Sequence, residues 1–252
     1  MKKSTYEKRA KIANDVMNYI YKYIDTNINI DELSCELHIS KFHLHRVFKE
    51  EFGKNIYESI KSIRLEKAAN LLISNKFSTI SNISSMIGYS SQTSFIRSFK
   101  QRFNMTPKEW KNGGYKEYSN KIIEKISISN DLDFSNIEPT IVKMPQMRGY
   151  YIRHKGYDKS IKKTWAKLQT WIYTNDIKEY KQMALHHDNP IITPLEECQY
   201  IAIVSLENDE LKDVTLPCLI IPKGIYAKFS LSGKYGDVIK LIQWVYHYWL
   251  ID

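Results

Sequence analysis

The chain has 252 residues, a length that suits two domains of ordinary size, and a formal net charge of +9 at neutral pH. Residues 1–118 carry 20 Lys and Arg against 12 Asp and Glu, whereas residues 119–252 carry 17 against 16. The positive excess therefore lies almost wholly in the first half. This asymmetry favours a polyanionic partner for that half, with nucleic acid ahead of an anionic membrane surface.

The three cysteines, Cys35, Cys198 and Cys218, are far apart in the sequence and form no C-x-x-C pair. They argue against a disulfide framework and against a zinc site built on cysteines. No run approaches the ~18 apolar residues of a membrane span, and residues 6–25 have the mixed spacing of an amphipathic helix rather than of a signal peptide. We expect a cytoplasmic protein that binds neither a metal nor another cofactor.

The first half contains an internal repeat. Ile30-Asp31-Glu32-Leu33 matches Ile80-Ser81-Asn82-Ile83, and an apolar residue follows each stretch four positions on. After one extra residue in the second copy, Arg46-Val47-Phe48-Lys49 matches Arg97-Ser98-Phe99-Lys100. Because one sequence repeat corresponds to one supersecondary unit, we expect two equivalent units.

Each copy predicts a helix, a tight turn and a second helix. Ser40, and either Ser90 or Ser91, can cap the second helices, because a serine hydroxyl accepts a hydrogen bond from a free backbone amide. Gly88 is a natural C-cap for the first helix of the second copy. The expected buried faces of the second helices consist of Leu44, Val47, Phe48 and Phe52 in one copy and of Phe95, Phe99 and Phe103 in the other.

The opposite faces of the second helices have the chemistry of a surface that reads DNA. Arg can form two hydrogen bonds to guanine, Gln can form two to adenine, and Thr or Phe can contact a thymine methyl group, while Lys suits phosphate. A solvated helix face would be the ordinary interpretation of either helix alone, but two matching copies favour DNA. The expected DNA-contacting residues are Lys41, Phe42, His45, Arg46, Lys49, Gln92, Thr93, Arg97 and Lys100.

The segment between the copies, Ile56–Ser74, has apolar residues near helical spacing and predicts a linking helix. A helix of about 20 residues spans roughly 30 Å. One turn of DNA is roughly 34 Å long. A linking helix of this length could place both reading helices in successive major grooves, so that a monomer would cover a long site.

Segment 8–111 resembles the DNA-binding domain of AraC/XylS-type transcription regulators. The resemblance rests on residues 39–49, 63–68 and 83–100, and on Phe103-Asn104-Met105-Thr106-Pro107 at the end of the domain. It implies promoter DNA and RNA polymerase as partners. By the same resemblance, the base-reading positions are those of Phe42, His45 and Arg46 in the first recognition helix and of Gln92, Thr93 and Arg97 in the second.

The helical pattern of the first half ends at the paired glycines Gly113 and Gly114. The second half has a weaker repeat, in which strand-like runs at 150–153 and 226–229 each precede a helix. Strands at 183–187 and Gln199–Leu206 follow the first helix, and we expect the second repeat to lack such closing strands. The expected buried residues are Ile161, Trp165, Leu168 and Ile172 in the first helix and Val238, Leu241, Ile242, Val245 and Trp249 in the second.

Residues 139–250 resemble the GyrI-like effector-binding domain, through residues 149–156, 165–168, 188–194 and 224–229. That family implies two βαββ halves around a groove for small, often lipophilic and cationic molecules, which aromatic faces attract. The expected ligand-binding residues are Tyr151, Trp165 and Tyr226, with core packing as the alternative. This sequence has no segment that matches the family's final strands. A constitutive DNA binder with a degenerate sensor domain that serves protein interaction is therefore the alternative function.

Enzymatic alternatives find less support. Pro217-Cys218 is similar to the start of the active-site motif of DNA alkyl-transfer proteins, but Leu219-Ile220 follows instead of the His-Arg that would activate a thiolate. A GyrI-like hydrolase would need a nucleophile, a base and an acid in one arrangement, and none is evident. His43 and His45 leave a helix in different directions and do not suit a shared metal. We therefore expect no catalytic residues and no metal ligands.

The predicted architecture has an all-α N-terminal domain and an α+β C-terminal domain. The first, residues 1–112, holds two helix-turn-helix units joined by a long helix. A linker at 113–138 leads to a GyrI-like tandem βαββ domain at 139–252, with its second half incomplete. The predicted function is that of a sequence-specific DNA-binding transcription regulator, an activator rather than a repressor, with a small-molecule sensing domain.

Overall fold

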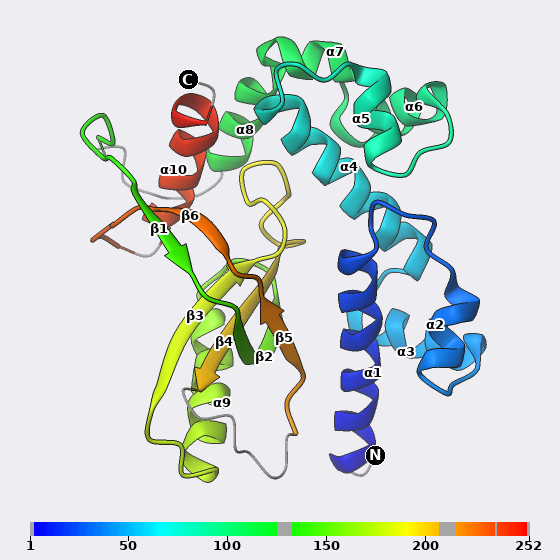
Figure 1. Ribbon diagram of the computed structural model, residues 1–252, viewed down its shortest axis with the longest axis vertical. Helices are drawn as coiled ribbons and strands as arrows, with labels where there is room; N and C mark the ends of the chain where they lie inside the picture. The colour runs from blue at the N-terminus through cyan, green and yellow to red at the C-terminus, as the bar shows by residue number, and fades with distance from the viewer. Residues whose placement is uncertain (1–2, 125–132, 207–214, 235, 251–252) are drawn as a thin grey trace. The chain divides into compact units, whose positions relative to one another are not determined.

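The computed structural model describes residues 3–124, 133–206, 215–234 and 236–250, and side-chain burial from residue 8 onward. The chain divides into two compact units, Met1–Gly114 and Tyr115–Asp252, called the first and the second unit below. The first unit is wholly helical, and the second contains the sheets (Figure 1). Among the described residues, no helix is long and apolar enough to cross a membrane.

The first unit consists of six longer helices followed by two short helical segments. The expected linking helix is present with the predicted bounds, Ile56–Ser74. The elements are α1 (Lys3–Lys22), α2 (Ile30–Glu36), α3 (Lys41–Phe52), α4 (Ile56–Ser74), α5 (Ile80–Met86), α6 (Gln92–Phe103), α7 (Pro107–Glu109) and the π-helix η1 (Trp110–Gly114). Thus α2 with α3, and α5 with α6, form the two helix-turn-helix units that the repeat predicts.

The two tight turns have the same backbone hydrogen bond. Ile39 N donates to Ser34 O at 3.0 Å in the first turn, and Tyr89 N donates to Ser84 O at 3.1 Å in the second. Each turn contains one residue with positive φ, His38 at 53° and Gly88 at 76°. This pattern is that of a Schellman C-cap, which needs a left-handed residue to reverse the chain after a helix.

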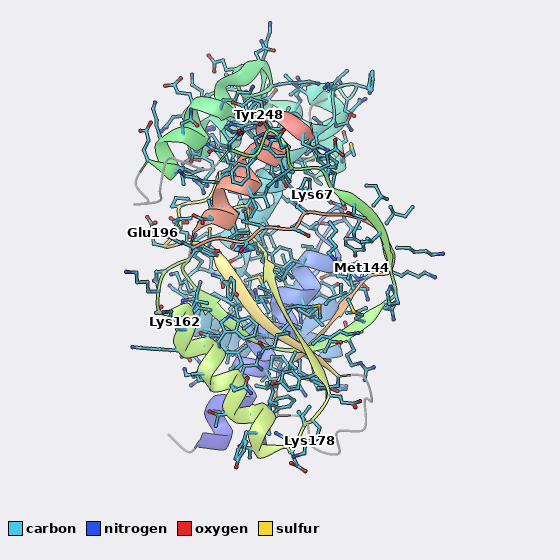
Figure 2. All side chains as sticks on the ribbon, turned by 90° about the vertical axis from the view of Figure 1, so that its left-hand side faces the viewer. Lys67, Met144, Lys162, Lys178, Glu196 and Tyr248 are labelled. Carbon is cyan, nitrogen blue, oxygen red and sulfur yellow. The ribbon has the colours of Figure 1, made fainter. Side chains whose placement is uncertain are left out.

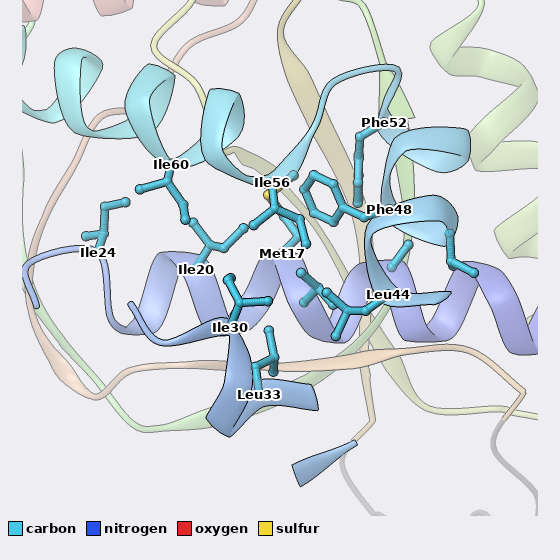
Figure 3. Packing of buried hydrophobic residues seen from close by; sticks show 13 residues of the cluster. Met17, Ile20, Ile24, Ile30, Leu33, Leu44, Phe48, Phe52, Ile56 and Ile60 are labelled. Carbon is cyan, nitrogen blue, oxygen red and sulfur yellow. The ribbon is translucent and has the colours of Figure 1, made fainter. Parts of the chain in front are cut away.

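The first helix-turn-helix repeat, α2 with α3, packs on α1. Its core is a cluster of aliphatic and aromatic side chains from α1, α2, α3 and the start of α4 (Figure 3). Val16, Ile20, Leu44, Phe48 and Ile56 are all at or near zero exposure within this cluster. Because the whole cluster contains side chains from four helices, burial of the apolar faces fixes the orientation of α3.

The second helix-turn-helix repeat, α5 with α6, also belongs to the first unit but has an aromatic core instead. Phe95, Phe99 and Phe103 lie on one face of α6, and Trp110 packs against the last two rings at 5.6 and 4.7 Å between centroids. The Trp110 Nε1 donates to the backbone oxygen of Ala69 in α4 at 3.0 Å. The hydrogen bond satisfies the polar edge of a fully buried indole and joins the end of this repeat to the linking helix.

The described residues of the second unit form two antiparallel sheets. The larger has the order β3-β4-β2-β5, and the smaller is a ribbon of β1 and β6. Helix α9 contacts β2 and β4. The elements are α8 (Tyr115–Ile123), β1 (Thr140–Met144), β2 (Met147–Lys155), α9 (Ile161–Thr174), β3 (Tyr180–His186), β4 (Gln199–Leu206), β5 (Cys218–Ile221), β6 (Gly224–Lys228), α10 (Asp237–Trp244) and the π-helix η2 (Val245–Trp249).

The four-stranded sheet has two chemically different faces. Tyr150 and His154 contact α9, through the ring of Trp171 and the hydroxyl of Thr164 respectively. Because side chains alternate along a strand, Tyr151 lies on the face away from α9, and its cross-strand partner is Ile203. Beside them Gly149 is required for packing, because a Cβ atom there would lie 2.3 Å from a methyl carbon of Ile203.

Several sequence expectations for the second unit are confirmed and others need correction. The strand Gln199–Leu206 has the predicted bounds, and β3 begins three residues earlier than the predicted strand at 183–187. The expected linker, 113–138, contains helix α8, and its residues 125–132 are outside the described part of the chain. No strand follows α10 within the described residues, which end at residue 250.

The buried face of α10 differs from the prediction. Leu241 is buried as expected, but Ile239 is the other buried apolar residue, and Val238, Ile242, Val245 and Trp249 are only half-buried. The helix passes after Trp244 into the π-helix η2, whose wider turn shifts the angular position of each later residue. In α9, the burial of Ile161, Leu168 and Ile172 is confirmed, whereas Trp165 is half-buried.

Candidate nucleic-acid interface

The first recognition helix, α3, is fixed at its start by Ser40. The Ser40 hydroxyl accepts a hydrogen bond from His43 N at 3.3 Å, as the sequence predicts for an N-cap. Since Leu44, Val47, Phe48 and Phe52 are buried, the opposite face is presented to solvent. On that face Lys41, Phe42, Arg46 and Lys49 are exposed, and His45 is half-buried beside the ring of Tyr57.

Phe42 is notable on this face because 77 % of its surface is exposed. A large apolar side chain gains nothing from this position in the free protein. Contact with an apolar group of a partner, such as a thymine methyl group in a major groove, would give it a function.

The second recognition helix, α6, repeats this arrangement. Here Ser91, rather than Ser90, is the N-cap, and its hydroxyl accepts from Ser94 N at 3.2 Å. Burial of the three phenylalanines leaves the expected residues Gln92, Thr93, Arg97 and Lys100 exposed. Arg46 and Arg97 therefore occupy equivalent exposed positions in two equivalent helices.

The two recognition helices differ in the contacts that their exposed cations make. Arg46 Nη2 donates to His43 Nδ1 at 3.1 Å, which requires a neutral imidazole with its proton on Nε2. Lys41 forms an ion pair with Asp31 of α2. No corresponding bond involves Gln92 or Arg97 within the part of the chain that the structure describes. His43 is a functional candidate that the sequence patterns miss, and its i, i+3 spacing from Arg46 is the signal that could have found it.

Side chains of α4 and of the segment after α6 hold the first unit together. From the middle of α4, Arg64 donates through Nε to Ile24 O and through Nη2 to Thr26 O, at 3.2 and 2.6 Å. Beyond the C-terminal end of α4, Lys111 Nζ donates to the backbone oxygens of Asn75 and Ser78. These bonds satisfy carbonyl groups at or near helix C-termini, which otherwise lack partners. The 19 residues of α4 span roughly 28 Å, close to the length of one turn of DNA.

The three expected ligand residues of the second unit do not share one surface. Tyr151 is fully buried in a cluster with Ile201 and Ile203, on the sheet face away from α9. Trp165 lies on α9, which covers the opposite face, and its Nε1 donates to the Tyr200 hydroxyl at 3.0 Å. Tyr226 lies in the separate β1–β6 ribbon, where its hydroxyl donates to Pro222 O at 2.7 Å.

A polar pair on the Tyr151 face is a further candidate that the sequence patterns miss. Arg153 Nη1 lies 3.0 Å from His187 Nδ1, and the guanidinium lies 5.7 Å from the centre of the Tyr151 ring. Burial, together with the positive charge of Arg153, holds the pKa of His187 well below its ordinary value. His187 is therefore a neutral acceptor at physiological pH, and only the fold brings it to Arg153.

Within the described ranges, no three His, Cys, Asp or Glu side chains lie close enough together to hold a metal ion. Cys218 is exposed and begins the edge strand β5, where it pairs with Tyr150 of β2. Cys35 is exposed on α2, and Cys198 is buried, where its Sγ donates to Thr193 O at 3.5 Å.

Comparison with known proteins agrees with this division. Residues 33–113 match the model of a helix-turn-helix domain, and residues 137–252 match the model of a GyrI-like small molecule binding domain.

Several curated regulators are similar to the first unit. The probable transcription factor PqrA of Proteus vulgaris is 37 % identical over 109 residues, which cover 41 % of this chain and 88 % of PqrA. The xylose operon regulatory protein of Escherichia coli is 40 % identical over 95 residues, 38 % of this chain. The match spans only about a quarter of that protein's length, 24 %.

Among solved structures, the C-terminal domain of AraT, a response regulator from Geobacillus stearothermophilus, is 25 % identical. The match covers 50 % of this chain and 93 % of that domain, with a TM-score of 0.38. The relation to PqrA over nearly its whole length, together with the two helix-turn-helix units, settles the family. The chain belongs to the AraC-type helix-turn-helix transcription regulators and carries a GyrI-like domain as its second unit.

Proposed function

We propose that the protein binds one asymmetric promoter site in double-stranded DNA, with α3 and α6 in two successive major grooves. The observation that carries the proposal is the equivalence of Arg46 and Arg97, both exposed on second helices of two repeats that a helix of 19 residues joins. In this arrangement Lys41, Lys49 and Lys100 hold phosphates. The residues that choose the sequence are Phe42, His45, Arg46, Gln92, Thr93 and Arg97.

The binding event regulates transcription, and the names of the relatives support this step. The matched proteins are called a transcription factor and an operon regulatory protein. We infer that this protein activates rather than represses by contact with RNA polymerase, and that it acts in the cytoplasm on the nucleoid. In this proposal the protein is not an enzyme. Residues 1–112 bind DNA, and residues 113–138 connect them to the sensing domain at 139–252.

The second unit senses a small lipophilic or cationic molecule in this proposal, through Tyr151, Trp165 and Tyr226. The match to a GyrI-like small molecule binding domain supports this role. A second candidate is a constitutive DNA binder whose second unit serves protein interaction. The full burial of Tyr151 and the position of Trp165 on the opposite side of the sheet favour this second candidate.

DNA selection followed by binding measurements tests the proposal. A duplex is first selected from a random library with the full chain, and its affinity is then compared with that of a scrambled duplex by fluorescence anisotropy. Arg46→Ala and Arg97→Ala should each weaken binding to the selected duplex by about 1–3 kcal/mol and relax its sequence at one position. Lys228→Ala, an exposed lysine of the second unit, serves as the control and should leave affinity unchanged.

Two results would contradict the proposal. One is a failure of the library to yield any preferred sequence. The other is an equal loss of affinity on selected and scrambled duplexes for both arginine variants, which would assign these side chains to phosphate contacts alone.

A thermal-shift titration against lipophilic cations distinguishes the two roles of the second unit. A ligand at a hundred times its dissociation constant should stabilise the native state by roughly 2.7 kcal/mol. A saturable shift with a few compounds would support sensing. Stabilisation by the selected duplex, without a shift from any cation, would support the constitutive binder.

A further inference from the structure

The exposed side of α9 carries a concentration of positive charge that the proposed function does not use. The segment 155–174 contains five lysines and one acidic residue, Asp158, although residues 119–252 as a whole are almost neutral. Lys159, Lys162, Lys163 and Lys167 are all exposed, and none forms an ion pair with the described residues. These four residues are called the α9 lysine patch below.

The patch lies on the side of α9 that faces solvent. Ile161, Thr164, Leu168 and Ile172 of this helix are buried, so Lys162, Lys163 and Lys167 occupy the opposite side. Figure 2 shows Lys162 at the outer side of α9. The single acidic neighbour is engaged locally, because Asp158 Oδ1 accepts from Ser160 N at 2.6 Å.

The position of the lysines is electrostatically unfavourable for the helix itself. The first turn of α9 has no acidic residue and no side-chain cap, and instead contains Lys162 and Lys163. Positive charge at a helix N-terminus opposes the helix dipole and is unfavourable for the helix. The pKa of His154 is lowered chiefly by burial, Asp158 opposes this shift, and Lys167 adds a smaller lowering. Lys162 and Lys163 therefore do not serve the stability of α9.

A polyanion that lies near the second unit would compensate for this cost. This step rests on the proposed function, in which DNA held by the first unit is such a polyanion. Because both units belong to one chain, tethering raises the effective concentration of that DNA around the patch. A membrane surface fits less well, since an interfacial helix needs an exposed apolar face and the apolar face of α9 is buried on the sheet.

We infer that the α9 lysine patch binds phosphates of the duplex outside the segment that α3 and α6 read. The contact is independent of base sequence, and it extends the DNA footprint of the protein beyond the two grooves. It gives the second unit a direct function on DNA, in addition to any ligand that it senses.

The salt dependence of DNA binding tests the inference with the full chain. Two duplexes are compared, the selected sequence alone and the same sequence with about two helical turns of arbitrary flanking DNA on each side. Lys162, Lys163 and Lys167 are replaced together by Gln. Because each phosphate contact contributes about 0.9 to the slope of log affinity against log salt, the slope on the long duplex should decrease in magnitude by about 2–3. The slope on the short duplex should stay unchanged.

A matched control separates the patch from net charge. Lys143, Lys223 and Lys228 are exposed lysines of the same unit outside the patch, and their joint replacement by Gln removes the same charge. This control should leave both slopes unchanged. An equal decrease in the control variant would show a general charge effect and overturn the inference.

Thermal stability supplies a second readout. Removal of positive charge from the first turn of α9 should leave the melting temperature equal or higher. An unchanged slope on the long duplex overturns the inference, and a lower melting temperature with that unchanged slope would show that the lysines are structural. A further outcome is that the wild-type chain binds anionic vesicles while the triple variant does not, with an unchanged slope on the long duplex. That result would overturn the inference and assign the patch to a membrane surface. If the wild-type chain prefers no short duplex at all, the proposed function itself fails, and this inference fails with it.

Discussion

The two helix-turn-helix repeats differ at two positions that matter for their turns and their exposed arginines. The left-handed turn residue is His38 in the first repeat and Gly88 in the second. The exposed Arg46 of the first repeat is hydrogen-bonded to His43, whereas Ser94 stands at the position of that histidine in the second repeat. The backbone hydrogen bonds of the two turns are the same. The comparison teaches that the repeat is conserved at the level of backbone geometry, while its side chains are specialised. In the first repeat a hydrogen bond to His43 orients Arg46. In the second repeat the turn position with positive φ is occupied by glycine, the residue that adopts this conformation most easily.

The largest expected effect concerns the two cores, which should be equally essential despite their different composition. Phe48→Ala and Phe99→Ala each remove a fully buried ring and should each cost about 3–5 kcal/mol of unfolding free energy. Urea unfolding followed by circular dichroism measures the loss. Phe42→Ala, at an exposed position of the same helix as Phe48, is the control and should stay within about 0.5 kcal/mol. A loss below about 1 kcal/mol at either core position would show that the two repeats are not equivalent.

The glycine of the second turn should be the next most sensitive position. Gly88→Ala introduces a Cβ atom at φ 76°, within 2.7 Å of the Arg64 guanidinium. Arg64 is held by two backbone oxygens, so we expect a cost of about 2 kcal/mol. Gly113→Ala has a similar backbone cost at φ 108° but nothing within 4 Å, and should cost less. Equal costs in the unfolding experiment would remove Arg64 from the explanation.

The hydrogen bond from Arg46 to His43 should affect DNA binding in the first repeat only. His43→Ala should weaken binding to the selected duplex by about 1 kcal/mol, because Arg46 loses the acceptor that orients it. Ser94→Ala, the equivalent change in the second repeat, should have no effect. A double-mutant cycle with Arg46→Ala measures the coupling, and strictly additive losses would show that His43 acts independently of Arg46.

The smallest expected effect is a gain in stability. His38→Gly relieves a side chain at φ 53° in the first turn and should stabilise the chain by about 0.5 kcal/mol, since only glycine adopts this conformation without a steric cost. His45→Gly, inside α3, should instead cost about 1 kcal/mol. If both variants destabilise the protein, the positive φ of His38 carries no strain and the two turns are energetically equal.

The first unit could be predicted almost completely because its signals are local. The Ser40 cap, the apolar spacing of Ile56–Ser74 and the three phenylalanines of α6 each depend on residues within a few positions, and the structure confirms them. The i, i+3 spacing of His43 and Arg46 is visible in the sequence, but the hydrogen bond between them also depends on the rotamers of both side chains.

The second unit was less predictable because its structure depends on distant pairing. β5, Cys218–Ile221, is only four residues long and exists through its register with Met147–Tyr150 of β2. The π-helical turn after Trp244 changes the angular positions of Val245 and Trp249, which no apolar spacing reveals. Tyr151 and Trp165 are close in the sequence. Because side chains alternate between the two faces along β2, and α9 covers only one of these faces, the two residues lie on opposite sides of the sheet.

The bonds that Trp110 makes to α4, and Lys111 to the segment directly after α4, also have a consequence for biosynthesis. These bonds join residues 33–41 positions apart and complete the helical unit as soon as residue 111 is available. Helical units with such short sequence separations fold faster than sheets that pair distant strands, as β2 pairs with β5. During translation the earlier segments generally fold first. We expect a nascent chain to acquire its DNA-reading half on the ribosome, well before the sheet of the other half is assembled.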